Sequence, residues 1–295
     1  MKILLLGKNG QLGWELQRSL APLGEVVALS STCKELCGNL ADLEGIAKTV
    51  RTVAPRVIVN ASAYTAVDKA ESDQEAARRI NALAPGVLAD EARRCGALLV
   101  HYSTDYVFDG SGTKPWEETD ATGPLNTYGL TKLEGEQAIA HAGCAHLIFR
   151  TSWVHAARGK NFARTMLQLA SERETLTVID DQAGAPTGAD LLADVSAHAI
   201  RQEAGSGRHS GIYHLAAGGE TTWHGYAEFV CGFARDHGIG LKVKEITPVP
   251  SSRFPTPARR PHNSRLDTAR VRGTFGLRLP HWKDGVGRML TEILL

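Results

Sequence analysis

Three glycines spaced three residues apart constrain this chain more than any other feature of its sequence. They are Gly7, Gly10 and Gly13, and they lie between the apolar run of residues 3–6 and a stretch where apolar residues recur at helical spacing. Glycine permits a tight turn and a close backbone approach, and the N–H groups that start the following helix favour an anion. A strand, a glycine turn and a helix in this order predict a βαβ unit that binds the pyrophosphate of a dinucleotide.

Short apolar runs recur along the first half of the chain. After residues 3–6 they occupy residues 26–29, 57–59, 98–100 and 147–149, and they alternate with stretches of helical spacing at residues 13–20, 70–95 and 127–141. Runs that are apolar on both faces fit parallel strands buried between two layers of helices. We therefore predict an α/β fold, a Rossmann-like doubly wound parallel sheet with a smaller C-terminal substrate-binding region.

The pattern loosens after about residue 155, where connections rich in glycine and proline separate shorter elements. We expect residues 1–155 to form a dinucleotide-binding domain, to which a segment near residues 184–215 returns. Residues 156–295 are expected to form mainly the substrate-binding region.

Five prolines within residues 248–261 exclude a regular helix or a central strand there, because proline lacks an N–H and restricts the residue before it. Arg259, Arg260 and Arg265 lie among or just after these prolines. We interpret this segment as a substrate-lining loop whose guanidinium groups suit phosphates. A surface linker is the alternative.

Composition excludes several classes of partner. The chain has 33 basic and 32 acidic side chains, which gives a formal net charge of +1. Nucleic acids and anionic membranes require basic residues in clustered excess, so neither is an expected partner. No apolar run approaches the roughly 20 residues that cross a bilayer, and the first residues lack the features of a signal peptide. We expect a cytoplasmic protein that acts on a small molecule.

The residues after the second predicted strand bear on the choice of cofactor. An acidic residue there would bind the adenosine 2′-hydroxyl and repel a 2′-phosphate. This chain instead has Ser30, Ser31 and Thr32, with Lys34 close behind. Three hydroxyls and an ammonium favour NADPH over NADH, unless these residues are only a solvated loop.

A tyrosine and a lysine stand four residues apart at the start of the third helical stretch. Tyr128 and Lys132 therefore project from one face of the predicted helix. An ammonium beside a phenol lowers the tyrosine pKa, which allows proton exchange with a carbonyl oxygen near neutral pH. Thr104 directly follows the fourth apolar run, at the sheet edge where ligands bind, and its hydroxyl could polarise the same carbonyl.

Together these motifs resemble those of an extended short-chain dehydrogenase/reductase, and longer strings narrow the resemblance. In chain order the strings are GQLG at residues 10–13, NASAYTAVDKAE at 60–71, STDYVFDG at 103–110, RTSWV at 150–154, DQAGAPT at 181–187 and RPHNS at 260–264. They resemble the dTDP-4-dehydrorhamnose reductase family over almost the whole chain, from Met1 to about Glu292.

This resemblance implies a reaction and a set of catalytic residues. The reaction is the NADPH-dependent reduction of the 4-keto group of dTDP-4-dehydro-β-L-rhamnose to dTDP-β-L-rhamnose, the last step of dTDP-L-rhamnose biosynthesis. Tyr128 is implied as the proton donor, and Lys132 as the residue that holds the nicotinamide ribose and tunes Tyr128. Thr104 is implied to hydrogen-bond the keto oxygen. A phenol and a hydroxyl there would stabilise the negative charge that hydride addition creates.

The resemblance also implies binding residues for both ligands. Those for the cofactor are Gly7, Asn9, Gly10, Gln11, Leu12, Ser30, Ser31, Asn39, Leu40, Ala61, Ser62, Ala63, Tyr102, Tyr128 and Lys132. Those for the substrate are Thr104, Asp105 and Trp153 around the sugar, and Arg260 and Asn263 at the nucleotide diphosphate. Packing inside the protein is the alternative for Tyr102, Trp153 and residues 61–63.

Some positions depart from the family pattern or leave it open. Many members have acidic residues near positions 30 and 39, where this chain has Ser30 and Asn39. The choice of cofactor therefore transfers least from the resemblance, and NADH stays an alternative. His155 replaces an aromatic residue that is common after Ser-Trp-Val, and we assign it no role. Glu15, Asp190 and Glu292 occupy positions where some members share Mg²⁺ across a homodimer interface. Isolated exposed carboxylates are the alternative there.

Other functions remain open at this point. The same motifs would serve another nucleotide-sugar 4-ketoreductase, or a noncatalytic NADP-binding regulatory subunit like the β subunit of methionine adenosyltransferase. A related dehydratase is disfavoured, because its pattern places Asp-Glu after the threonine where this chain has Asp105 and Tyr106.

Overall fold

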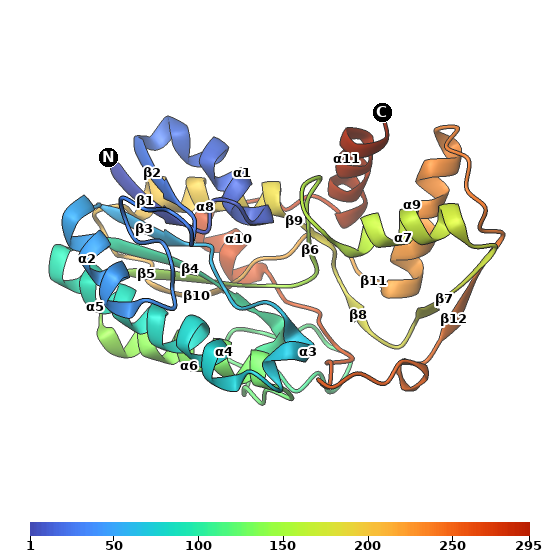
Figure 1. Cartoon of the computed structure of the whole chain (residues 1–295), viewed down its shortest axis with the longest axis horizontal. Coiled ribbons are helices and arrows are strands. Elements are labelled where there is room, and N and C mark those ends of the chain that lie inside the picture. Colours follow the sequence, from blue (N-terminus) through green and yellow to red (C-terminus); the bar gives the residue numbers. More distant parts are fainter.

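A six-stranded parallel sheet forms the centre of the larger part of the molecule (Figure 1). The computed structural model describes residues 1–295. The strand order is β2-β1-β3-β4-β5-β10, and every neighbouring pair is parallel. The strands are β1 (Lys2–Leu6), β2 (Glu25–Leu29), β3 (Val57–Asn60), β4 (Leu98–Thr104), β5 (His146–Thr151) and β10 (Gly211–His214). The first five contain the five predicted apolar runs.

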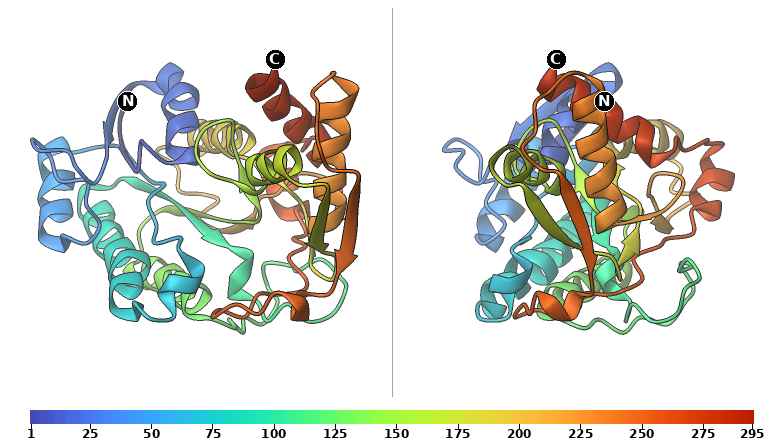
Figure 2. Two further views of the ribbon diagram at one scale, coloured as in Figure 1. Left: turned by 45° about the vertical axis from the view of Figure 1, so that its right-hand side comes forward. Right: turned by 90° about the vertical axis from the view of Figure 1, so that its right-hand side faces the viewer.

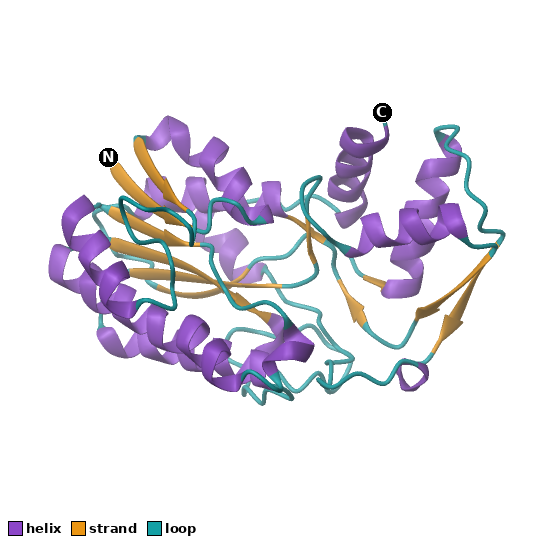
Figure 3. Ribbon diagram, viewed as in Figure 1, coloured by secondary structure: helices purple, strands orange, loops and turns teal.

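Helices cover both faces of this sheet, which confirms the predicted doubly wound α/β fold (Figure 3). One face packs against α1 (Gln11–Leu20), α8 (Ala189–Glu203) and α10 (Ala269–Phe275). The other face packs against α2 (Leu43–Val53), α5 (Ala84–Cys95) and α6 (Thr127–Ala142). The order of the strands switches at β1: β2 lies on one side of β1, and β3 and the later strands lie on the other. The carboxyl ends of β1 and β3 are therefore the expected place for a ligand.

The second helical stretch differs from its prediction. A helix was expected over residues 70–95, but the segment divides into α3 (Val67–Ala70), α4 (Gln74–Arg78), the π turn η2 (Arg79–Leu83) and α5. Pro85 lacks an N–H and cannot bond to the carbonyl of Asn81, so the helix widens just before it. Helix α2 was not predicted; Asp42 caps it by accepting a hydrogen bond from the N–H of Gly45 at 2.9 Å.

The later half of the chain supplies a second cluster of elements, at the right of Figure 1 and in both views of Figure 2. Helices α7 (Phe162–Glu172), α9 (Trp223–Asp236) and α11 (Trp282–Leu294) pack with the parallel pair β7 (Thr175–Ile179) and β12 (Glu245–Val249) around a separate apolar core. The remaining short elements occur in both halves of the chain and are η1 (Ala21–Leu23), η3 (Asp105–Val107), β6 (Val154–His155), β8 (Ala183–Gly184), β9 (Thr187–Gly188), β11 (Thr221–Thr222) and η4 (Ser251–Arg253). None of the helices is both long and apolar enough to cross a membrane.

Helix α6 approaches the π turn closely at Gly135. A Cβ at this position would lie 2.1 Å from the carbonyl oxygen of Asn81. The Asn81 side chain in turn bonds the backbone N–H and carbonyl of Tyr64 and the hydroxyl of Thr131. The close contact between α6 and η2 is thus possible only because Gly135 has no side chain.

We predict opposite effects for the same substitution at two helical glycines. Gly135→Ala should lower the free energy of unfolding by about 1–3 kcal/mol, because the added methyl group overlaps the backbone of Asn81. Gly232→Ala, in the interior of α9 with no atom within 4 Å of its Cβ, should raise it by about 0.5–1 kcal/mol. Urea unfolding of both variants measures the difference. Equal stabilisation by the two substitutions would contradict the close approach.

Candidate active site

Two cavities lie at the carboxyl ends of the sheet strands and beside the second cluster. The first, which we call the glycine-turn cavity, has a volume of about 420 Å³. The second, which we call the apolar cavity, has about 550 Å³ and lies against α7, β7 and α9. Tyr128 lines the first and Tyr106 the second, and their rings meet edge to face with centroids 5.7 Å apart. The two cavities are therefore neighbours on either side of this ring pair.

The glycine turn has the shape needed to hold a phosphate. Gly7 has φ +93°, and a Cβ there would lie 2.7 Å from the Ser62 Oγ. A Cβ on Gly13 would lie 2.0 Å from the carbonyl oxygen of Gly7, so the turn packs directly on the first turn of α1. Gly10 is the N-cap of α1 and provides no side-chain cap. The first N–H groups of α1 are left for a ligand, and the turn fits a dinucleotide pyrophosphate.

Most of the predicted cofactor residues line the glycine-turn cavity. They are Gly7, Asn9, Gly10, Gln11, Leu12, Ser30, Ser31, Ala61, Ser62, Ala63, Tyr102, Tyr128 and Lys132. Asn39 and Leu40 do not line it: Leu40 is buried in the core, and the Asn39 side chain accepts a hydrogen bond from the N–H of Ala41.

The loop after β2 presents hydroxyls rather than charge. Ser30 is buried, and its Oγ lies 3.1 Å from the Thr32 Oγ1 and 3.4 Å from the Cys33 Sγ. Ser31 is exposed at the cavity, whereas Lys34 is exposed and does not line it. Of the predicted phosphate-binding groups, the two serines are the ones that reach the cavity.

The three predicted catalytic residues come from two elements that meet at this edge. Thr104 is the last residue of β4, and Tyr128 and Lys132 lie in the first two turns of α6. The Asn126 side chain caps α6 at the N–H of Gly129. A Cβ at Gly129 would lie 2.1 Å from the carbonyl oxygen of Tyr106, so glycine lets α6 approach closely enough to place Tyr128 beside Tyr106.

The pKa of Tyr128 differs from its prediction. We expected Lys132 to lower it, but burial raises it to about 12, with a further rise from the charge of Asp105 and an opposing effect of the Thr104 hydroxyl. The Lys132 Nζ instead donates to the carbonyl of Tyr102 at 2.6 Å and lies 3.0 Å from the His101 Nε2. Burial lowers the pKa of Lys132 to about 8. A phenol with this pKa stays protonated at neutral pH and suits a proton donor.

Asp105 lies directly beside this group. Its Oδ1 accepts a hydrogen bond from the Thr104 hydroxyl at 3.1 Å, and its Oδ2 has no partner. Burial raises the pKa of Asp105 to about 7. An unpartnered buried oxygen beside Thr104 is suited to bind a substrate hydroxyl.

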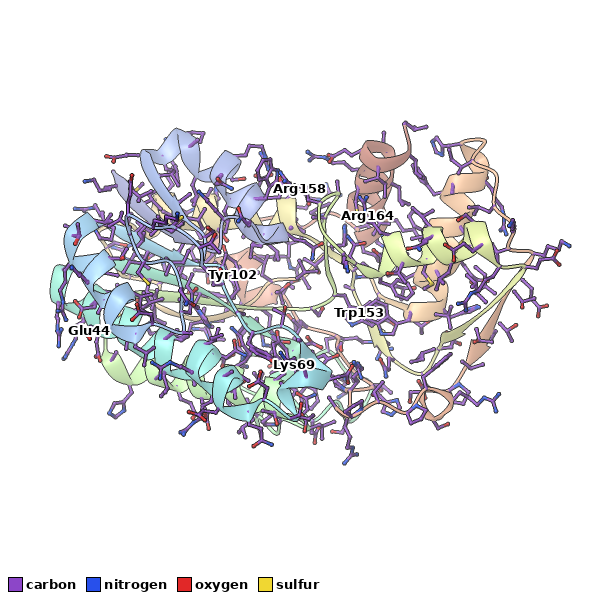
Figure 4. The ribbon with its side chains drawn as sticks, in the orientation of Figure 1. Glu44, Lys69, Tyr102, Trp153, Arg158 and Arg164 are labelled. Carbon is purple, nitrogen blue, oxygen red and sulfur yellow. The ribbon has the colours of Figure 1, made fainter.

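Trp153 lies on the side of the second cluster, whereas Tyr102 lies on the sheet (Figure 4). The Trp153 indole stacks on Trp223 with centroids 3.7 Å apart. Trp153 has a φ of +50°, which is unusual for a residue with a side chain. Trp223 lines the apolar cavity. The predicted sugar contact at Trp153 is thus joined to this cavity through a second tryptophan.

The residues predicted to face the diphosphate have different surroundings. Arg260 lines the apolar cavity and forms a bidentate ion pair with Asp68, with distances of 3.1 and 2.7 Å. Asn263 is buried, and its amide nitrogen donates to the carbonyls of Ser111 and Lys114. The structure therefore gives Asn263 a place in anchoring the loop that contains residues 111–114.

The apolar cavity contains residues that the sequence analysis missed. They are Tyr106, Phe162, Met166, Leu169, Arg173, residues 175–179, Gln182, Trp223 and Phe254. Tyr106, Gln182 and Phe254 lie in segments that the sequence singled out, but no individual role was predicted for them. The other residues lie in α7, in β7, at Arg173 between these two elements, and in α9, where no local motif marks them. The scattered aromatic residues of the second half were the one available signal.

The structure gives no support to a magnesium site. Glu15, Asp190 and Glu292 do line one small cavity of about 20 Å³, together with His155. However, Arg288 lies 3.4 Å from both the Asp190 and the Glu292 carboxylates. No group of three or more histidine, cysteine, aspartate or glutamate side chains is arranged to hold a metal ion. Arg288 thus pairs with two of the three carboxylates, and Glu15 pairs with Arg18 at 3.4 Å.

Comparisons with known proteins agree over the full length of the chain. The family model described as the RmlD substrate binding domain matches residues 1–295. The chain is 58% identical over 293 residues to the dTDP-4-dehydrorhamnose reductase of Salmonella typhimurium, covering 99% of this chain and 98% of that protein. It is 50% identical over 303 residues to the Burkholderia thailandensis enzyme of that name, covering 100% and 99%.

Solved structures show the same similarity. The dTDP-4-dehydrorhamnose reductase of Clostridium acetobutylicum has a TM-score of 0.91 at 35% identity, with 100% of both chains covered. The Bacillus anthracis enzyme, in complex with NADP, has a TM-score of 0.88 at 31% identity, with 99% of both chains covered. With its sequence and its fold both matched from end to end, the chain belongs to the RmlD family of dTDP-4-dehydrorhamnose reductases.

Proposed function

We propose that this protein reduces the 4-keto group of dTDP-4-dehydro-β-L-rhamnose to give dTDP-β-L-rhamnose, with NADPH as the reductant. The observation that supports this most is the position of Tyr128 and Thr104. Tyr128 lines the cavity shaped for a dinucleotide and contacts Tyr106, which lines a second cavity large enough for a nucleotide. Thr104 is buried beside Tyr128, and its hydroxyl counteracts the rise in the Tyr128 pKa. A reductase needs its proton donor at this junction, between the hydride source and the carbonyl.

The glycine-turn cavity is the proposed cofactor site. The pyrophosphate would bind the glycine turn and the N-terminus of α1, and Ser30 and Ser31 would face the adenosine ribose. Tyr102 and Lys132 would face the nicotinamide half. When bound there, NADPH supplies the hydride. The solved relative in complex with NADP supports NADPH, and neither serine carries a charge that would repel its 2′-phosphate.

The apolar cavity is the proposed site of the nucleotide. Trp223 and Phe254 offer aromatic surfaces to a thymine base, and Arg260 offers a cation to the diphosphate. Asp68 holds the Arg260 guanidinium in place without enclosing it, because the Arg260 side chain remains 25% exposed. The sugar would then extend past Tyr106 to Tyr128, with Trp153 and Asp105 beside it.

The proposed chemistry depends on proton donation from Tyr128. Hydride addition places negative charge on the keto oxygen, and an alkoxide is a far stronger base than a phenolate. Proton transfer from Tyr128 is therefore favourable even though burial raises its pKa to about 12. The Thr104 hydroxyl donates a hydrogen bond to the same oxygen when substrate displaces its bond to Asp105. The phenolate regains its proton from solvent.

The setting of the protein follows from the same proposal. The five cysteines are all free, which is typical of the reducing cytoplasm, and we propose that the enzyme acts there. Residues 1–155, with the returning segment near residues 184–215, would serve the cofactor, and most of residues 156–295 would serve the substrate. A homodimer stays a prediction.

Oxidation of NADPH and NADH by the purified protein tests the function directly. The substrate is dTDP-4-keto-6-deoxyglucose, supplied with and without the 3,5-epimerase. We expect oxidation only with the epimerase, together with formation of dTDP-L-rhamnose. Oxidation without epimerase would indicate a different 4-ketoreductase, and NADPH binding without any turnover would favour a regulatory subunit.

Tyr128→Phe should reduce kcat by about 100-fold or more, because the ring remains while the proton donor is lost. The Kd for NADPH, measured by fluorescence, should change little. Steady-state kinetics at saturating substrate give the comparison. Turnover near the wild-type rate would contradict the role of Tyr128.

Ser30→Asp should raise the KM for NADPH relative to that for NADH, because the carboxylate repels the 2′-phosphate. Ser30→Asn is the matched control, since asparagine has almost the same shape as aspartate but no charge. The ratio of kcat/KM for the two cofactors is measured in both variants. An unchanged ratio in Ser30→Asp would remove this loop from the cofactor site.

Arg260→Met should raise the KM for the dTDP-sugar by about tenfold or more, because a charge-assisted contact with the diphosphate is lost. Arg259→Met is the control, since Arg259 is exposed and does not line the cavity. Initial rates over a range of sugar concentrations distinguish the two. Equal KM values would place the diphosphate elsewhere.

A further inference from the structure

His101 is a buried titratable residue to which the proposed reaction gives no role. It lies in β4 and is 1% exposed, as are Asn60 at the end of β3 and Lys132 in α6. Asn60 and His101 are register partners in the sheet, so their side chains lie on the same face. The two ring nitrogens have one partner each: Nδ1 is 3.1 Å from the Asn60 Nδ2, and Nε2 is 3.0 Å from the Lys132 Nζ.

The hydrogens of this group can be counted. A neutral imidazole has one N–H donor and one acceptor nitrogen. With the Asn60 amide nitrogen donating to Nδ1, the ring proton is on Nε2. Nε2–H then donates to Lys132, which is possible only when Lys132 is a neutral amine. The arrangement of these three side chains therefore matches the uncharged form of the lysine.

The ammonium form of Lys132 requires the opposite arrangement. It donates to Nε2, which moves the ring proton to Nδ1, and Asn60 must then present its amide oxygen to the ring. That oxygen now accepts a hydrogen bond from the Ser62 N–H at 3.2 Å. The change thus reaches Ser62, which lines the same cavity as Lys132. His101 connects two walls of the glycine-turn cavity from behind.

We propose that His101 is a positioning residue that holds Lys132 in both of its protonation states, by exchanging ring tautomers against the amide of Asn60. This inference rests on the proposed function, because it assigns His101 to the holding of a residue at the reacting group. An acidic residue in its place would bind only the ammonium, and an apolar one would bind neither form. A neutral imidazole can serve as acceptor for one form and as donor for the other.

The charges around Lys132 make both states accessible. Glu136 lies one turn along α6 and raises the pKa of Lys132, but it is held in a bidentate pair with Arg150 at 2.6–3.2 Å. Burial has the opposite and larger effect, and the pKa falls to about 8. Burial and the Lys132 charge also keep the pKa of His101 well below its usual value, so the ring itself stays neutral. The other titratable groups near this end of α6 and β4 are Tyr102, Asp105, Tyr106 and Tyr128, and burial raises the pKa of each of them.

Nitrogen NMR of the histidine rings tests the exchange without any catalysis. In ¹⁵N-histidine-labelled protein the His101 signals are assigned by their loss in His101→Gln. From about pH 6.5 to about pH 9.5 we expect the proton to move from Nδ1 to Nε2, with a midpoint near pH 8. A single neutral tautomer over the whole range, or a doubly protonated ring near neutral pH, would overturn the proposal.

The pH dependence of kcat tests the consequence for the enzyme. His101→Phe removes both hydrogen bonds, so the Lys132 ammonium loses an acceptor and its pKa should fall. The alkaline limb of the profile should then move to lower pH by about one unit. His101→Gln has one acceptor and one donor group, and it should keep the limb near the wild-type position. If the alkaline limb of the kcat profile does not move in a folded His101→Phe variant, the proposal is wrong.

Leu99→Val is the control for lost packing. Leu99 lies two residues before His101 on the same face of β4 and is fully buried. This variant should leave the limb in place even if it lowers stability. If His101→Phe folds too poorly to be assayed, two other results decide. The proposal is overturned if His101→Gln shifts the alkaline limb of the kcat profile and the His101 ring of the wild type keeps one tautomer at every pH. Absence of wild-type turnover would contradict the proposed function alone, since the NMR experiment does not need the reaction.

Discussion

Close backbone contact at the switch point of the sheet is the constraint on which the rest of the site depends. The turn after β1 lies directly on the first turn of α1 and against the segment that follows β3, with no space for a Cβ at Gly7 or Gly13. This contact places the open N-terminus of α1 beside the end of β3, which pairs with β1 up to Asn60. Strand β3 pairs in turn with β4 up to His101, and Thr104 lies three residues further along β4.

Polar side chains gather at this one edge because parallel strands end together. Along β3 and β4 the residues facing α5 and α6 are apolar until Asn60 and His101, the last paired position on that face. Beyond this position the strands leave the core, and hydroxyl, amide and imidazole groups can find partners. The burial of Lys132 among them is tolerated because it has two hydrogen-bond partners.

Features that are encoded locally could be predicted from the sequence. Strands apolar on both faces, such as residues 98–100, and the glycine turn have a pattern that does not depend on distant residues. The widening of the helix before Pro85 was missed because its extent depends on the partners that Asn81 finds in Tyr64 and Thr131. The pKa of Tyr128 was predicted in the wrong direction, because spacing places Lys132 near it but does not show burial or the competing partners of the ammonium. The apolar cavity is assembled from distant segments, so the sequence predicted only its proline-rich side, where Phe254 and Arg260 line it.

The edge-to-face contact between Tyr106 and Tyr128 has a consequence for how the phenol is held. Tyr106 forms part of the wall of the neighbouring cavity, so a molecule that fills that cavity restrains the Tyr106 ring, and this ring restrains the rotation of Tyr128. An occupant of a cavity that Tyr128 does not itself line would thus limit the torsional freedom of its phenol. In the proposed reaction, a nucleotide bound far from the reacting carbon would stiffen the phenol before any bond to the sugar changes.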